Sequence, residues 1–230
     1  MASETCVICT VAAAVSQAHI PGRMFFDTPL PDNLITVPSC KDCNGGVKND
    51  EEYLRAFLLA LRGDVSGAAI ESVRGRVTRQ LGYQPLLRQR FLEASELRSE
   101  TGVDGAVALG LHTAPDSARL RNVLSNYARA LHFWCTGTVA PPDALLSIER
   151  VFHRQTRPPE YWAPILAALD FATAGTVTTR GATGEFRLSF RELRRADLLS
   201  AMVIEFYRSF AYVALICRPG TNPDAIRLPF

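Results

Sequence analysis

The sequence predicts an α+β fold, in which a small zinc-stabilised N-terminal segment precedes a mixed helical and antiparallel β region. Three observations predict it: paired cysteines near the N-terminus, stretches of apolar residues at helical spacing, and later runs rich in strand-forming residues. The chain has 230 residues, of which 47% are hydrophobic, so it can bury the core of one large domain or two small ones. We expect a division into residues 1–64 and residues 65–230, with the second part an α+β accessory domain packed on the first.

The formal net charge is only +2, so the overall charge of the chain does not by itself favour binding to nucleic acid or to a membrane. Arginines gather at 74–79, 88–90, 119–121 and 191–195, where they form either solvated helix faces or binding patches. No apolar run reaches the length of a membrane span, and the short apolar stretch at 11–15 lacks the basic region that precedes a signal sequence. We therefore expect a cytoplasmic protein that makes no contact with a membrane and keeps its six cysteines reduced.

Four of the cysteines form the pattern C-x2-C-x30-C-x2-C, from Cys6 and Cys9 to Cys40 and Cys43. Two residues between cysteines let both sulfurs of a tight turn face one ion, and two such pairs supply the four thiolates of a closed tetrahedral zinc site. Buried thiols or disulfides are the alternatives, but the repeated spacing and the absence of an export signal favour a structural zinc ion. The remaining cysteines, at 135 and 217, lie in apolar surroundings and are expected to be core thiols.

The segment between and after the cysteine pairs has a recognisable order of elements. His19 stands beside a Pro-Gly turn, residues 34–37 are strand formers, and Asn33 directly precedes them. The acids at 50–52 suit a helix N-terminus, and apolar residues then repeat at helical spacing up to Leu61. The predicted order is therefore cysteine pair, strand with His19, loop, strand with Asn33, cysteine pair, helix.

This segment resembles the HNH endonucleases, whose core is a ββα-metal nuclease unit with a zinc-knuckle variant. His19 matches the first His of the motif, Asn33 the middle Asn, and Asn44, directly after the last cysteine, the third position. The phrase "NLITVPSCKDCN…NDEEYLR" is similar to a group of bacterial HNH proteins; the strong match covers Cys6 to Leu61, and a weaker match spans much of the remainder. The resemblance implies a metal-dependent endonuclease that hydrolyses phosphodiester bonds in DNA.

The resemblance also implies a role for each matched residue. His19 would be the general base, Asn33 would orient its imidazole, and Asn44 would help to hold a catalytic divalent metal ion, Mg or Mn. Taken singly, these residues have other readings: a turn histidine, a strand cap and a helix N-cap. Their joint spacing favours the catalytic interpretation.

One position departs from the family pattern. HNH proteins usually carry an acid directly before the first His, where it ligates the catalytic metal, and this chain has Ala18. Another group supplies the ligand, or the metal is bound weakly, or cleavage has been lost. Asp27, Asp42 and Asp50 are candidates for the missing ligand, and Asp50 is favoured slightly by its place about two helical turns beyond Asn44. The competing hypothesis is a catalytically degenerate zinc-binding module that binds nucleic acid or a protein partner.

Beyond residue 64 the sequence predicts further helices and strands. Helices are expected over 67–82, 85–100 and 115–135, and strands over 103–113, 144–153, 176–190 and 201–216. The helix at 115–135 should bury a stripe made of Leu120, Val123, Leu124, Tyr127, Leu131 and Trp134. The histidines of this region, at 112, 132 and 153, are expected to be packing or surface residues. Arg119 and Arg121 could face DNA phosphates, although a solvated helix face is the simpler reading. The sequence gives no indication of the oligomeric state.

Overall fold

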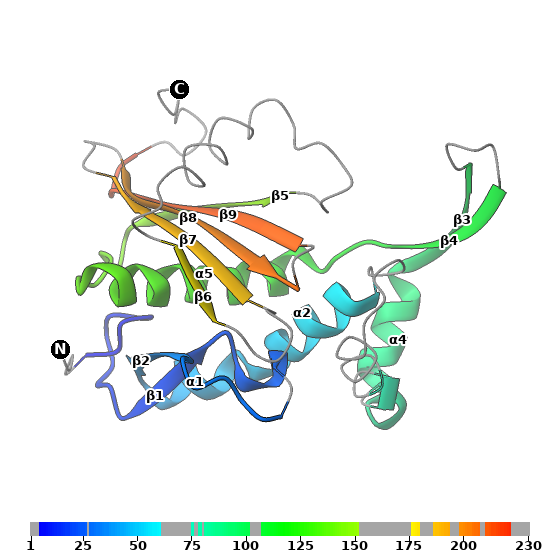
Figure 1. Cartoon of the computed structure of the whole chain (residues 1–230), viewed down its shortest axis with the longest axis horizontal. Coiled ribbons are helices and arrows are strands. Elements are labelled where there is room, and N and C mark those ends of the chain that lie inside the picture. The colour runs from blue at the N-terminus through cyan, green and yellow to red at the C-terminus, as the bar shows by residue number, and fades with distance from the viewer. Residues whose placement is uncertain are drawn as a thin grey trace.

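The long helix α5 (Ser117–Thr136) lies between an N-terminal unit and a five-stranded antiparallel sheet (Figure 1). The structure is a computed structural model and describes residues 5–26, 28–60, 75, 78–79, 81–101, 107–151, 176–179, 186–193, 198–207 and 210–221. Mixed helices and antiparallel sheets confirm the predicted α+β class. In the described part of the chain, no helix is long and apolar enough to cross a membrane.

The N-terminal unit is a β-hairpin followed by two helices. Strands β1 (Ser16–Ile20) and β2 (Ile35–Ser39) pair antiparallel, which sets His19 opposite Thr36. The turn between them contains the short 3-10 helix η1 (Arg23–Phe25), and α1 (Lys41–Gly46) and α2 (Lys48–Ala60) follow the hairpin. The predicted order of elements is confirmed, with two differences at the boundaries. Asn33 lies in the turn directly before β2, and the helical segment already begins at Lys41.

Helix α5 begins and ends at residue types that favour helix termini. The side chain of Asp116 caps the N-terminus by accepting a hydrogen bond from Arg119 N (3.2 Å). Gly137, with φ 71°, ends the helix in the left-handed conformation that glycine adopts without strain, and its N–H donates to Phe133 O. The predicted apolar stripe is buried except at Trp134, whose side chain is 41% exposed. That part of the prediction is wrong: Trp134 lies in the last turn of the helix, which ends at Thr136, and is exposed there.

The five-stranded sheet has the order β5-β9-β8-β7-β6 with antiparallel neighbours throughout. Its strands are β5 (Leu145–Val151), β6 (Thr176–Thr179), β7 (Phe186–Glu192), β8 (Leu198–Phe206) and β9 (Phe210–Cys217). The face toward α5 shares one buried cluster with the N-terminal unit. Phe25 of η1 packs on Phe206 of β8 with ring centroids 5.3 Å apart, so the two parts of the chain meet in a common core.

Helix α4 (Pro85–Glu93) packs beside α2, with the ring centroids of Phe91 and Tyr53 5.4 Å apart, and the hairpin of β3 (Ser95–Thr101) and β4 (Val107–Thr113) projects away from the rest of the molecule (Figure 1). The predicted helix over 85–100 is therefore wrong in its second half. The chain leaves the helix at Ala94, Ser95 Oγ donates to Phe91 O (2.6 Å), and the residues that follow pair with β4. Most of the helix expected at 67–82, and the predicted domain boundary at 64, lie outside the described residues.

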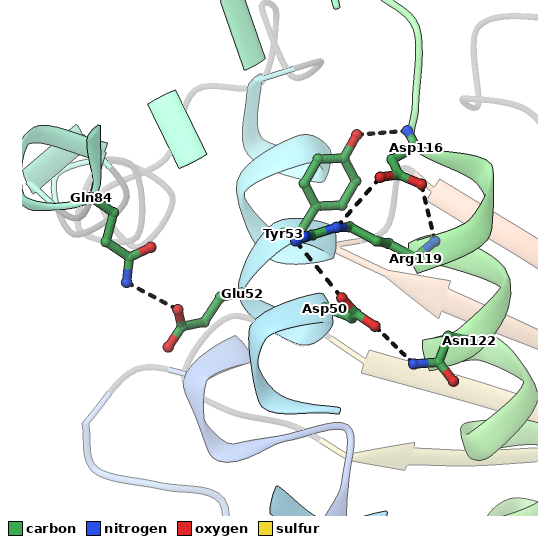
Figure 2. A network of polar contacts seen from close by, with 7 residues as sticks. All are labelled: Asp50, Glu52, Tyr53, Gln84, Asp116, Arg119 and Asn122. Atoms are coloured by element: carbon green, nitrogen blue, oxygen red, sulfur yellow. Dashed lines mark hydrogen bonds and ion pairs between the residues drawn. The ribbon is translucent and has the colours of Figure 1, made fainter. Parts of the chain in front are cut away.

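Polar contacts fix α2 against α5 (Figure 2). Asp50 accepts a hydrogen bond from Asn122 Nδ2 (2.7 Å) and lies 3.7 Å from the guanidinium of Arg119. The hydroxyl of Tyr53 accepts a hydrogen bond from Asp116 N (2.7 Å). The side chain of Asp50 is thus used in the contact between the two helices.

Candidate functional site

The four cysteines of the double pair come together in the N-terminal unit. Their sulfur atoms all lie within 4.8 Å of one another, and Sγ of Cys9 is 3.9 Å from Sγ of Cys40. Four sulfurs at about 2.3 Å from one tetrahedral ion would be about 3.8 Å apart. The cluster can therefore hold a metal ion such as zinc with little movement.

The local backbone explains why the sulfurs converge. Cys40 is the N-cap of α1 and its Sγ accepts a hydrogen bond from Cys43 N (3.4 Å), so one turn of helix brings the second pair together. The first pair lies in a tight turn closed by the hydrogen bond from Thr10 N to Cys6 O, and Val7 N ties this turn to Pro38 O of β2. Burial alone would raise the pKa of Cys6, but hydrogen bonds from backbone N–H groups outweigh it and lower that pKa to about 6. The backbone thus favours a thiolate at this position.

A cavity of about 230 Å³ lies beside the cysteine cluster, and Cys43 contributes to its wall. Strand β1 and the turn between β1 and β2 contribute Ala18, His19, Gly22 and Arg23. The other walls come from the helices: Asn44 and Val47 at the α1–α2 junction, Lys48 and Glu51 of α2, and Asn126 and Tyr127 of α5. The N-terminal unit and α5 therefore build the cavity together.

His19 has a defined tautomer and partner. The Nε of Arg23 donates a hydrogen bond to Nε2 of His19 (3.0 Å), so Nε2 carries a lone pair and the neutral ring holds its proton on Nδ1. Burial, and then the charge of Arg23, lower the pKa of His19 below its usual value. Both effects keep the imidazole uncharged near neutral pH, which is the form that can accept a proton.

One face of the helical segment lines the cavity with residues at helical spacing. Asn44, Val47, Lys48 and Glu51 are separated by three, four and seven positions, which places them on one side of a helix. The Nδ2 of Asn44 donates to Ser16 Oγ (3.1 Å) and to Gln17 O (3.4 Å), which leaves its Oδ1 as the atom that can bind a cation. This face thus offers a hard oxygen ligand, an ammonium group and a carboxyl group in succession.

Glu51 is a buried carboxyl group in the wall of this cavity, with an exposed fraction of 7%. The hydroxyl of Tyr127 donates to its Oε1 (2.6 Å), and Gly22 N donates to the same hydroxyl (3.1 Å). Burial raises the pKa of Glu51 to about 7, against the opposing effect of these hydrogen bonds. A Cβ at residue 22 would lie 2.6 Å from Glu51 Oε2, so a larger residue there would have to displace the carboxylate.

The structure brings some of the expected site residues together and leaves others apart. His19, Asn44 and Ala18 share the cavity, whereas Asn33 is exposed and is not among the described residues that line it. Of the candidates for the missing acid, Asp50 faces α5, Asp42 lies in the first turn of α1, and residue 27 lies outside the described residues.

Four members of the site were not predicted from the sequence: Arg23, Lys48, Glu51 and Tyr127. The spacing of Lys48 and Glu51 from Asn44 was the available signal for two of them. Tyr127 lies 76 residues from its partner Glu51, so no local pattern points to it.

The other histidines and cysteines lie outside this cavity as far as the structure describes them. His132 is buried on α5 with its Nδ1 3.0 Å from Ser200 Oγ, as expected of a packing residue, and His112 lies on β4. Cys217 is buried in β9, and burial raises the pKa of the partly buried Cys135 to about 12. The position of His153 is outside the described residues.

Comparisons of the chain with protein-family models, with curated proteins and with solved structures found no match. The interpretation of the site therefore depends on its own geometry and chemistry.

Proposed function

We propose that the chain is a metal-dependent endonuclease of the HNH type that hydrolyses phosphodiester bonds in DNA. The observation that carries the proposal is the shared cavity, in which a neutral histidine, an amide oxygen and two cationic side chains meet beside a four-cysteine cluster. Phosphodiester hydrolysis needs a base for the attacking water and positive charge around the phosphate. His19 meets the first need, and Arg23 and Lys48 meet the second.

Arg23 gives the site a way to couple substrate binding to activation of the base. Its guanidinium donates a hydrogen bond to Nε2 of His19 in the structure. A guanidinium also binds phosphate oxygens strongly. A phosphate that enters the cavity would compete for Arg23 and release Nε2. The freed lone pair can then take a proton from water as the oxygen attacks phosphorus.

Two metal ions belong to this proposal. The four thiolates of Cys6, Cys9, Cys40 and Cys43 would hold a structural zinc ion, which has no open position for chemistry. A divalent cation such as Mg or Mn at Asn44 Oδ1 would neutralise charge on the phosphate and on the leaving oxygen. The donors suit such an ion, because amide and carboxyl oxygens are hard ligands.

A plasmid-nicking assay with magnesium, manganese or nickel tests the proposal. The wild-type chain should nick DNA, and His19→Ala should lose about 10²- to 10⁴-fold in rate, the usual contribution of a general base. His112→Ala is the matched control, because His112 belongs to β4 of the projecting hairpin, and it should keep wild-type activity. Equal activity of His19→Ala and wild type would refute the role of His19.

A second candidate function is favoured by one observation, the alanine at position 18 in the cavity wall. Without an acid at that position, the unit could serve as a zinc-stabilised module that binds nucleic acid or a protein partner. Binding of DNA without cleavage by any of the three metals would support this function and exclude the endonuclease.

A further inference from the structure

We infer that Glu51 supplies the anionic ligand for a divalent cation in the cavity beside His19, in place of the acid that is missing at position 18. This inference rests on the proposed function, because it concerns the cation that the nuclease reaction would use. It goes beyond the motif, since Glu51 lies outside the matched positions and comes from the next turns of the helical segment.

Glu51 is positioned in the wall of the cavity. Glu51 follows Asn44 by seven residues and Lys48 by three, on the face that lines the cavity. It is the one carboxyl group among the described residues in that wall. A water molecule fills about 30 Å³ in the liquid, so the 230 Å³ cavity has room for a cation and several of its waters. Magnesium commonly keeps several waters when a protein binds it through one or two oxygen ligands.

The carboxylate of Glu51 also has the capacity to accept more bonds than the hydrogen bond it receives from Tyr127. An ionised carboxylate has about four acceptor sites. Tyr127 donates to Oε1, and the backbone N–H of Gly22 in turn donates to the hydroxyl of Tyr127. The remaining lone pairs are available to the cavity that the group lines. A buried anion needs a partner of opposite charge, and a cation in this cavity would provide one.

Neighbouring groups hold the carboxylate of Glu51 in one orientation. A carboxylate that ligates a metal is usually held by hydrogen bonds from neighbouring groups. Here the fully buried Tyr127 and the close backbone at Gly22 hold Glu51 in place, since Oε2 would lie 2.6 Å from any Cβ at residue 22. The group is therefore fixed before a cation arrives.

Binding of Mn²⁺ to the zinc-loaded full chain tests the inference, with free Mn²⁺ followed by electron paramagnetic resonance. Wild type should bind one Mn²⁺, and Glu51→Gln should weaken that binding about tenfold or more. Glu52→Gln is the matched control, because Glu52 accepts from Gln84 Nε2 (3.1 Å) instead of lining the cavity, and its affinity should stay near wild type. Zinc content and circular dichroism should be unchanged in both variants.

Gly22→Ala provides a second variant in case Glu51→Gln does not fold. It keeps every candidate ligand but displaces the carboxylate of Glu51, so it should also weaken Mn²⁺ binding. Wild-type affinity in a folded Glu51→Gln or Gly22→Ala chain would overturn the inference, and so would a wild-type chain that binds no Mn²⁺.

The experiments distinguish failure of the endonuclease proposal from failure of the inference for Glu51. If Mn²⁺ binds through Glu51 but no nucleic acid is cleaved, the metal site stands and the endonuclease does not. If DNA is cleaved while Mn²⁺ affinity is unaffected by Glu51→Gln, the endonuclease stands and the role of Glu51 does not.

Discussion

Arg23 acts on His19 at the scale of single residues, through a hydrogen bond to Nε2 and through its charge. We expect Arg23→Ala to raise the pKa of His19, because it removes a positive charge that disfavours the imidazolium form. Nuclear magnetic resonance of the imidazole ring across pH measures this directly. Arg88→Ala, at an exposed position of α4, should leave the pKa unchanged.

The same substitution has a consequence for activity. A general base works when it is unprotonated, so a raised pKa moves the acidic limb of the rate profile toward higher pH. Arg23→Ala should therefore lose relatively more activity at pH 6 than at pH 8. An unchanged or lowered pKa in this variant would show that Arg23 does not control the charge of His19.

Ala18 is the second position where a single side chain matters. It lies on the buried face of the hairpin opposite Val37, is 4% exposed, and contributes to the cavity wall. Because we infer that Glu51 already supplies the anionic ligand, Ala18→Asp should leave magnesium-dependent cleavage near the wild-type rate; a site that lacked such a ligand would instead gain about tenfold or more, equivalent to about 1.4 kcal/mol of barrier. The substitution should also lower the thermal stability of the chain without divalent cation, because a buried carboxylate then has no partner.

Two measurements check the Ala18→Asp prediction: nicking rates in magnesium, and melting temperatures with and without it. Unchanged activity with an intact fold is the result expected from the inference for Glu51, and a rise of tenfold or more would contradict that inference. A melting temperature that is the same with and without magnesium would contradict the expected coupling between the new carboxylate and the cation.

At the scale of elements, Cys40 has two functions that one substitution can separate. It is a candidate metal ligand and also the N-cap of α1. Serine is a good N-cap, so Cys40→Ser should keep the cap but lose the thiolate. We expect the variant to hold well under one zinc per chain and to lose amide-exchange protection in β1 and β2, because binding energy at such a site is folding energy.

Cys135→Ser is the control for this prediction, since Cys135 is a partly buried thiol of α5 outside the cluster. It should retain one zinc per chain and the protection of the hairpin. Full zinc content in Cys40→Ser, measured on purified protein, would show that Cys40 is not a ligand.

The elements also show what sequence could and could not predict. Helix α5 was predictable because its apolar period, its cap at Asp116 and the glycine at its end agree. Strand β3 was not, because its residues include good helix formers such as Leu97 and Arg98, and pairing with β4 overrides that preference. Glu51 was hidden in an acidic run that suits any helix N-terminus, and only the long-range contact with Tyr127 distinguishes it.

At the scale of the whole molecule, α5 joins the cysteine cluster and the sheet in one buried core. Tyr127 lines the cavity and donates a hydrogen bond to Glu51. Leu131 is fully buried further along the same helix. The hydroxyl of Tyr207, directly after β8, lies 3.5 Å from Phe25 O of η1. The N-terminal unit therefore depends on the sheet for part of its burial.

This shared core predicts a single cooperative unfolding transition. Leu131→Ala should destabilise the chain by about 2–5 kcal/mol, the usual cost of truncating a buried leucine, although Leu131 lies far along the chain from the cysteines. Urea unfolding followed by far-ultraviolet circular dichroism and by zinc release to a coloured chelator should give coincident curves. Both midpoints should move down together in the variant. Leu92→Ala is the matched control, because Leu92 of α4 is 64% exposed and should shift neither midpoint appreciably. Two separate transitions, with only the circular dichroism curve shifted by Leu131→Ala, would mean that the N-terminal unit folds on its own and that α5 is not needed to hold Glu51 and His19 in one cavity.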